Sequence, residues 1–231
     1  MTTATTDQPH TGHHTPRIKL CGFTREVDVQ DAIDVGADYV GFVCYPKSPR
    51  FVTPERIGVL AAMLPSHITP VLLFVNAQAQ DVQAAVAQAP GAVLQFHGEE
   101  TLAECEQLSQ QLGLPFWKVA RVPTGLGAAG FDLLQFNKQY RPAQAILLDA
   151  KIDAYGGGGH SFDWTAFPWS HPELNASHRL VLSGGLTPAN VTDGIRLARP
   201  WAVDVSSGIE QAKGIKDRAR MLAFCQAVRS A

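Results

Sequence analysis

One aspartate and one cysteine stand where their side chains can do acid–base chemistry. Asp149 ends the short apolar run 145–148, and a loop with four glycines at 156–159 follows it. Glycine permits the backbone conformations with which such a loop can close over a ligand. Far upstream, Cys21 ends another short apolar run and precedes Gly22. A carboxyl group and a thiol, each at the end of its own strand, indicate an acid/base pair rather than a binding module.

Both side chains also have a structural interpretation. A thiolate base needs a lowered pKa, because a free thiol ionises at about pH 8.5. The charge of Lys19 could lower it, or Lys19 could pair with an acid below Cys21 and leave the thiol as a buried apolar filler. Asp149 acts as an acid if burial raises its pKa, but it could equally cap a helix or pair with Lys151. The residues alone leave these alternatives open.

Two loops rich in glycine and serine indicate a phosphate site. They cover 183–188 and 205–210, after the last two apolar runs of the chain. Such loops expose backbone N–H groups that bind phosphate beside a helix N-terminus. One Gly-Gly pair is usually a tight turn, but two such loops predict a phosphorylated substrate. The candidate phosphate-binding residues are Gly184, Gly185, Ser206, Ser207 and Gly208.

A further candidate is Arg50, which stands between Pro49 and Phe51. A guanidinium group held in this way is suited to a bidentate grip on a carboxylate. Surface arginines are common, so without further context the residue itself favours no special role.

The elements that must position these residues alternate along the chain. Eight short apolar runs carry a strand pattern, at 18–20, 39–43, 71–75, 92–95, 116–119, 145–148, 180–182 and 202–205. Helical patterns occupy most of the gaps, at 26–36, from Thr53-Pro54 onward, and at 78–89, 101–112, 131–140, 188–198 and 215–228. Thr53, Asp163 and Thr187 are expected to cap helices, and 168–177 is expected to be irregular.

This alternation predicts a (β/α)8 barrel in a single α/β domain. A doubly wound open sheet shares the alternation, but eight units without a linker after Pro16 favour the closed barrel. We expect a disordered leader over 1–16 and the barrel domain over 17–231. Side-chain alternation along the strands directs a set of polar residues inward, toward one mouth of the barrel. That set comprises Lys19, Cys21, Gln95, His97, Asp149 and Asp204.

Composition narrows the classes of partner. The 231 residues are 45% hydrophobic and carry a net charge of −2, which predicts neither nucleic-acid nor membrane binding. No apolar run approaches the roughly 20 residues that span a bilayer. The polar start lacks the apolar segment of a signal peptide, so we expect a cytoplasmic protein. The four cysteines have neither metal-finger nor redox spacing, so no metal is predicted.

Seven ordered motifs resemble the phosphoribosylanthranilate isomerase family of tryptophan biosynthesis. They are 19–22 (Lys-Leu-Cys-Gly), 41–43 with 48–52, 95–98 (Gln-Phe-His-Gly), 147–149, the glycine loop leading to 162–164, 182–186 and 203–208. They occur in the family's order over 17–210. Two departures are mild: the glycine loop reads Gly-Gly-His-Ser at 158–161, and 119–122 is a loose version of its counterpart.

The resemblance implies an Amadori rearrangement of N-(5-phosphoribosyl)anthranilate without a cofactor. It implies that Asp149 protonates the ribose ring oxygen and that Cys21 removes the C2′ proton. It further implies that Arg50 contacts the anthranilate carboxylate and that the two glycine loops hold the phosphate. His97 and Asp204 would line the site, with Lys19 and Gln95 beside them.

Two alternatives remain. One is the histidine-pathway aminoaldose isomerase, which has a related barrel but uses two aspartates and shows a twofold repeat, whereas this chain has Cys21 on its first strand. The other is a phosphate-binding barrel without catalysis. The sequence does not decide between a monomer and a homodimer.

Overall fold

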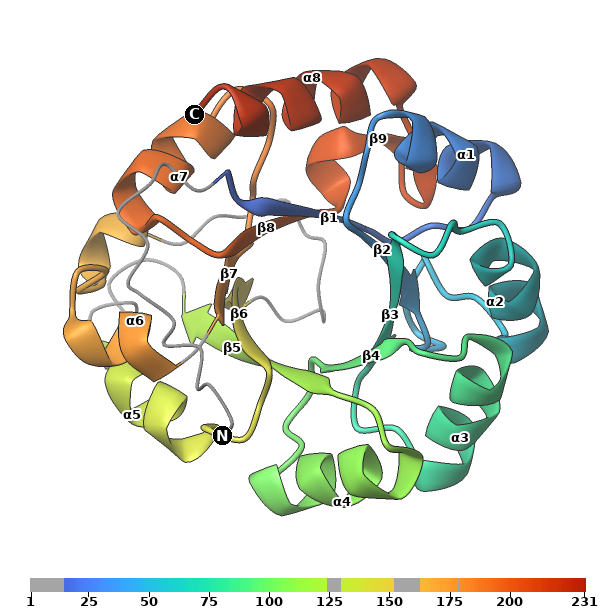
Figure 1. Cartoon of the computed structure of the whole chain (residues 1–231), viewed down its shortest axis with the longest axis horizontal. Coiled ribbons are helices and arrows are strands. Elements are labelled where there is room, and N and C mark those ends of the chain that lie inside the picture. The colour runs from blue at the N-terminus through green and yellow to red at the C-terminus, as the bar shows by residue number, and fades with distance from the viewer. Residues whose placement is uncertain (1–14, 124–129, 152–162, 178) are drawn as a thin grey trace, which may run out of the picture.

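Eight parallel strands form a closed barrel in the order β1 to β8 (Figure 1). The computed structural model describes residues 15–123, 130–151, 163–177 and 179–231. The strands are β1 (Arg17–Cys21), β2 (Tyr39–Val43), β3 (Thr69–Phe74), β4 (Val93–Phe96), β5 (Phe116–Pro123), β6 (Ala145–Lys151), β7 (Arg179–Leu182) and β8 (Ala202–Val205). Pairing of β1 with β8, in which Lys19 lies opposite Asp204, closes the ring. The predicted fold class is confirmed.

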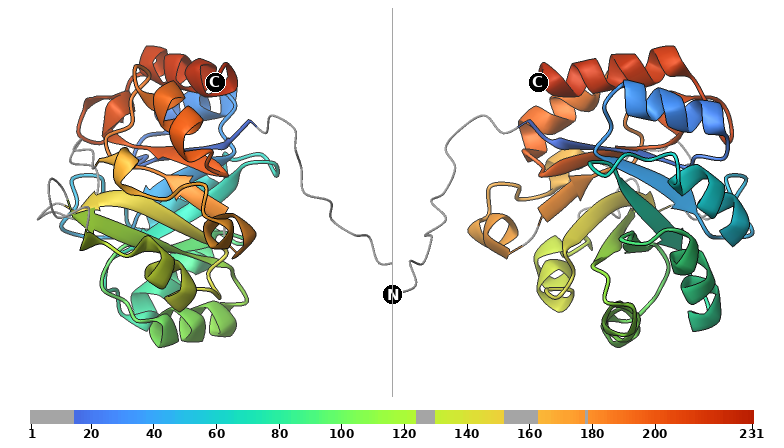
Figure 2. Two further views of the ribbon diagram at one scale, coloured as in Figure 1. Left: turned by 90° about the vertical axis from the view of Figure 1, so that its left-hand side faces the viewer. Right: turned by 45° about the vertical axis from the view of Figure 1, so that its right-hand side comes forward.

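Helices surround the barrel on the outside, as the turned views show (Figure 2). They are α1 (Glu26–Asp34), α2 (Pro54–Ala61), α3 (Ala79–Gln88), α4 (Leu102–Leu112), α5 (Leu133–Gln139), α6 (Pro172–Ser177), α7 (Val191–Ala198) and α8 (Arg218–Arg229). The predicted caps at Thr53 and Asp163 are confirmed: Thr53 accepts from Arg56 N, and Asp163 accepts from Thr165 N at the short 3-10 helix η2 (Trp164–Ala166).

Three local predictions are wrong. Segment 168–177 is not irregular throughout, because it contains α6. Thr187 does not cap α7: its N–H donates to Asn190 Oδ1, which closes a turn and delays the helix to Val191. The segment 215–228 does not begin as a helix. A hairpin of β9 (Glu210–Ala212) and β10 (Ile215–Lys216) comes first, and α8 starts only after Asp217, which caps it.

Two apolar layers build the core. Ile18 and Leu20 belong to the layer between strands and helices, whereas Leu147 and Ala202 belong to the cluster inside the barrel, as the alternation predicts. Tyr39, Trp117 and Trp201 pack edge-on or tilted inside the barrel, with ring centroids 5.0 to 5.9 Å apart. These three rings fill the end of the barrel at which the strands begin, called the lower end here. The polar side chains that could react are therefore confined to the upper end, at which the strands finish.

Two predictions fall on residues outside the described ranges. They are most of the leader expected over 1–16 and the glycine loop at 156–159. The division into a leader over 1–16 and a barrel domain over 17–231 therefore stays a prediction.

Candidate active site

Cys21 lies at the end of β1, buried with only 4% of its surface exposed. Its neighbours form a small apolar cluster at the upper end of the barrel, consisting of Val43, Leu73, Val75 and Tyr45. Opposite it on β2 stands Gly41, where a Cβ atom would lie 2.6 Å from Cys21 Sγ. Only glycine leaves the space that the thiol occupies. The thiol therefore sits in an apolar wall to which an aromatic ring can pack.

Below Cys21, Lys19 and Asp204 form a buried ion pair. Lys19 Nζ lies 2.8 Å from Asp204 Oδ1, and Ser183 Oγ donates to Asp204 Oδ2 at 3.2 Å. Of the two roles open to Lys19, the structure shows the pairing with an acid. Burial raises the pKa of Cys21, and the charge of Lys19 opposes this rise without reversing it. The lowered thiol pKa that a base at this position was expected to have is therefore not found.

Asp149 lies near the end of β6 and contacts the histidine predicted on β4. Asp149 Oδ2 is 3.2 Å from His97 Nε2, and its Oδ1 accepts from the backbone N–H of Ala150. Gln95 Nε2 approaches His97 Nδ1 at 3.3 Å. An amide nitrogen can only donate, so Nδ1 accepts and Nε2 carries the hydrogen that points to Asp149. The three inward polar residues thus form one chain that ends at the carboxyl group.

The two glycine-rich loops touch each other. Gly184 and Gly185 both have positive φ angles, of 81° and 71°. A Cβ atom at Gly208 would lie only 2.0 Å from the backbone oxygen of Leu186, so the loop after β8 packs directly on the loop after β7. Ser206 precedes the 3-10 helix η3 (Ser207–Ile209). The five predicted phosphate-binding residues therefore gather beside the end of the barrel that carries Cys21.

Arg50 reaches the same end of the barrel and holds a carboxylate of the protein itself. Its Nε and Nη2 donate to the two oxygens of Glu210, each at 2.7 Å, and both side chains are about 5% exposed. Lys216 Nζ approaches Glu210 Oε1 at 2.9 Å from the other strand of the hairpin. Neither Glu210 nor Lys216 was predicted as a site residue: Glu210 ends the loop at 205–210, and Lys216 lies in 215–228, which reads as helical. The Lys213-Gly214 turn is the one local signal of the hairpin.

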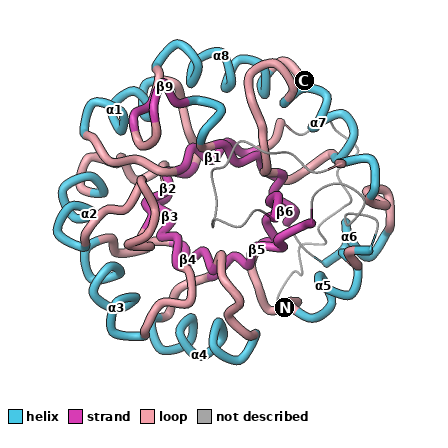
Figure 3. The backbone as a smooth tube through the Cα atoms, turned by 180° about the vertical axis from the view of Figure 1, so that it is seen from behind, coloured by secondary structure: helices cyan, strands magenta, loops and turns pink. Residues whose placement is uncertain are grey.

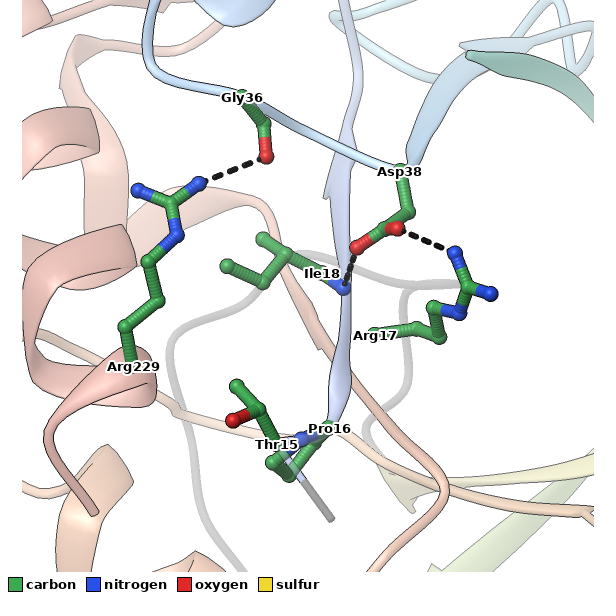
Figure 4. A pocket seen from close by; sticks show the side chains of 7 residues that line it. All are labelled: Thr15, Pro16, Arg17, Ile18, Gly36, Asp38 and Arg229. Carbon is green, nitrogen blue, oxygen red and sulfur yellow. Dashed lines mark hydrogen bonds and ion pairs between the residues drawn. The ribbon is translucent and has the colours of Figure 1, made fainter. Parts of the chain in front are cut away.

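The described residues contain no group of three His, Cys, Asp or Glu side chains that could hold a metal ion. A hollow of about 360 Å³ lies at the other end of the barrel, around the start of β1 (Figure 4). There Arg17 pairs with Asp38, and Arg229 donates to the backbone oxygen of Gly36. None of the candidate site residues lines it. Among the described helices, none is long and apolar enough to cross a membrane.

An eight-stranded parallel barrel with polar side chains and glycine loops at its upper mouth defines the class of (β/α)8-barrel enzymes, whose active sites lie at that mouth. Comparison with known proteins defines the family. A family model described as N-(5'phosphoribosyl)anthranilate (PRA) isomerase matches residues 18–227. The N-(5'-phosphoribosyl)anthranilate isomerase of Leptothrix cholodnii is 53% identical over 215 residues, which cover 93% of this chain and 91% of that protein.

Comparison with solved structures supports the same family. The phosphoribosyl anthranilate isomerase of Thermotoga maritima superposes with a TM-score of 0.79 at 34% identity, covering 94% of this chain and all of that one. A second structure of such an isomerase holds reduced 1-(o-carboxyphenylamino)-1-deoxyribulose 5-phosphate, with a TM-score of 0.77, 31% identity and the same coverage. The chain belongs to the N-(5'-phosphoribosyl)anthranilate isomerase family, and the resemblance noted in the sequence is confirmed.

Proposed function

We propose that this chain converts N-(5-phosphoribosyl)anthranilate into 1-(2-carboxyphenylamino)-1-deoxyribulose 5-phosphate, the isomerase step of tryptophan biosynthesis. Family membership supports the reaction. The observation that carries the assignment to this site is the placement of a carboxyl group and a thiol, Asp149 and Cys21, near the upper ends of two strands of one barrel. The abutting glycine loops after β7 and β8 support binding of the substrate phosphate.

The chemistry needs proton transfers at four atoms of the substrate, two gains and two losses, and no net change in composition. Asp149 donates a proton to the ribose ring oxygen, the C1′–O bond breaks, and the nitrogen lone pair forms an iminium at C1′. The iminium acidifies the C2′ hydrogen, which the Cys21 thiolate removes to give an enolamine. Protonation at C1′ and loss of the proton from the 2′-hydroxyl then yield the ketone at C2′. His97 Nε2–H stabilises the Asp149 carboxylate that remains after the first transfer.

The raised pKa of Cys21 is compatible with this role. A thiolate of raised pKa is the stronger base once it forms. The two neighbouring ammonium groups, Lys19 and Lys216, both favour its ionised form. The apolar wall around the thiol excludes water from the reacting carbon, which strengthens the electrostatic effect of these charges.

The other substrate groups have candidate partners as well. Arg50 would hold the anthranilate carboxylate, and Gly184, Gly185, Ser206, Ser207 and Gly208 would hold the phosphate. Lys19, Gln95 and Asp204 would support the floor of the site. The glycines at 156–159 would form a closing loop, but this proposal lies outside the described residues.

Substitution of the two reacting groups tests the proposal. We expect Cys21→Ala and Asp149→Asn each to lower kcat by roughly 10²- to 10⁴-fold, the usual contribution of a positioned acid or base. The measurement is loss of the substrate's fluorescence with purified full-length protein. Matched controls are Cys44→Ser, which follows β2 and packs against the layer between strands and helices, and Asp163→Asn, at an exposed cap. Activity near wild type in Cys21→Ala would refute its assignment as the base.

The cellular setting is also a proposal. We propose that the enzyme acts in the cytoplasm on a small phosphorylated substrate, as a monomer or a homodimer, without nucleic-acid or membrane partners. One solved relative is described as mutually generated monomers of the dimeric phosphoribosylanthranilate isomerase of Thermotoga maritima. Light scattering coupled to size-exclusion chromatography separates the two oligomeric states.

A further inference from the structure

Gln95 on β4 is a polar side chain buried in apolar surroundings. Its exposed fraction is 0%, and the residues opposite it in register on the neighbouring strands are Leu73 and Trp117. Its Oε1 has no hydrogen-bond partner among the residues that the structure describes. A buried polar atom without a partner costs stability, and native proteins keep few of them. Packing alone therefore does not explain why an amide stands here.

The Gln95 amide contacts the imidazole of His97, two positions further along the same chain segment. Gln95 Nε2 lies 3.3 Å from His97 Nδ1. Because an amide nitrogen only donates, Nδ1 accepts, and the neutral ring carries its hydrogen on Nε2. That hydrogen points to Asp149 Oδ2, which lies 3.2 Å from Nε2. The contact crosses from β4 to β6, with β5 between them in the ring that Figure 3 shows from behind.

The backbone that carries His97 is held by hydrogen bonds and a buried ion pair. The N–H of His97 donates to Phe74 O at 2.8 Å. At the next residue, Gly98, the N–H donates to Glu100 Oε2 at 2.9 Å, and the carbonyl accepts from Lys118 Nζ at 2.8 Å. Glu100 and Lys118 also pair with each other at 2.8 Å. Because this backbone is fixed, the contact with Gln95 decides which ring nitrogen of His97 holds the hydrogen.

The place of this hydrogen determines whether His97 competes for the proton of Asp149. With the hydrogen on Nε2, that nitrogen donates to Asp149 and has no lone pair with which to accept. The proton then stays on Asp149 until it passes to the ribose ring oxygen. With the hydrogen on Nδ1, the lone pair of Nε2 would face Asp149 and take this proton, either as a hydrogen bond or by full transfer. Only the first tautomer leaves Asp149 free to act as an acid.

We propose that Gln95 is a positioning residue that fixes this tautomer of His97 and so reserves the Asp149 proton for the substrate. The inference rests on the proposed function. Gln95 has no exposed surface with which to touch a substrate, so it acts on the chemical step and not on binding. After the proton has left, the same Nε2–H group donates a charge-assisted hydrogen bond to the carboxylate.

The test replaces the donor at His97 Nδ1 with an acceptor. In Gln95→Glu a carboxylate oxygen takes the place of the amide nitrogen, and since an ionised carboxylate only accepts, Nδ1 must carry a hydrogen. The matched control is Gln144→Glu, because Gln144 Oε1 also contacts a ring nitrogen, Trp117 Nε1 at 3.0 Å, at the lower end of the barrel. Nitrogen-15 NMR of histidine-labelled protein distinguishes a ring nitrogen that carries hydrogen from one that does not. The signals that disappear in His97→Gln identify the ring.

In the wild-type protein at about pH 8, where an ordinary histidine is neutral, we expect the hydrogen of His97 on Nε2 and none on Nδ1. Gln95→Glu should place a hydrogen on Nδ1 and lower kcat by roughly 10- to 100-fold, part of what a positioned acid contributes, with KM within about twofold of wild type. Gln144→Glu should change neither quantity. A merely structural defect would not move the hydrogen to Nδ1. A wild-type ring with its hydrogen on Nδ1, or a Gln95→Glu protein with wild-type kcat, would overturn the inference.

A second variant covers the case in which Gln95→Glu does not fold. Gln95→Met removes the donor without adding a charge, and it should lower kcat while KM stays unchanged. A folded Gln95→Met protein with wild-type kcat would overturn the inference.

The NMR measurement separates this inference from the proposed function. A wild-type protein that does not turn over N-(5-phosphoribosyl)anthranilate overturns the proposed function. In that case a hydrogen that lies on Nε2 in wild type and on Nδ1 in Gln95→Glu still supports the control of His97 by Gln95. A His97 ring that is the same in both proteins contradicts it.

Discussion

Adding a single methyl group at Gly208 tests the joint phosphate site. In Gly208→Ala the new Cβ would stand 2.0 Å from the backbone oxygen of Leu186, whereas ordinary contacts begin at 3.4 Å. The loops after β7 and β8 must therefore separate by about 1.4 Å. Neither can yield cheaply, because the opposing atom belongs to the backbone. A misplacement of about 1 Å costs on the order of 10²-fold in rate when it affects the groups that position a substrate.

Steady-state kinetics and inhibition by inorganic phosphate provide the assay for Gly208→Ala. We expect kcat/KM for the phosphorylated substrate to fall roughly 10²-fold and inhibition by free phosphate to weaken in parallel. The matched control is Gly130→Ala, since a Cβ at Gly130 meets nothing within 4 Å. Thermal unfolding checks that both variants fold. A Gly208→Ala enzyme with wild-type kinetics and phosphate inhibition would refute the argument that these loops form the phosphate site.

Two further predictions concern the buried ion pair between Lys19 and Asp204 and the thiol of Cys21. Lys19→Met should lower the free energy of unfolding, measured in urea, by about 3–5 kcal/mol, because it leaves Asp204 buried without a counter-charge. The double variant Lys19→Met/Asp204→Leu should lose less of this free energy. An equal loss in the two variants would contradict the prediction. The rate at which iodoacetamide alkylates Cys21 can be followed by peptide mass spectrometry. Because burial raises the pKa of Cys21, this rate should keep rising with pH beyond about 8.5, the ordinary thiol pKa. A plateau of the rate below pH 8 would show a lowered pKa.

Local periodicity was sufficient to predict the fold and the direction of the polar side chains. The predicted bounds of β2 and β8 coincide with those observed. Because side chains alternate along a strand, one correct strand also determines which residues face the interior. Lys19 and Asp204 accordingly meet inside the barrel although 185 positions separate them. Once the eight strands are known, a closed ring leaves few alternatives for the direction in which each side chain points.

The pairing within the site could not be predicted in the same way. Arg50 and Glu210 are 160 positions apart, and Lys216 is 195 positions from Cys21. Nothing in the local pattern at 210–216 reports these partners, and the helical pattern at 215–228 concealed the hairpin. The direction of the Cys21 pKa also depends on burial that only the assembled barrel defines. Long-range contacts, rather than local propensity, determine these features.

The fate of the hydrogen at C2′ tests the central claim most directly. Full-length protein is given N-(5-phosphoribosyl)anthranilate carrying deuterium at C2′, and the product is followed by mass spectrometry and NMR. The account predicts that the wild-type protein forms the 2-keto isomer and loses the deuterium to solvent. Product forms more slowly than from unlabelled substrate when proton removal limits the rate. The Cys21→Ala protein should form almost no product. Equal product formation by folded Cys21→Ala would contradict it.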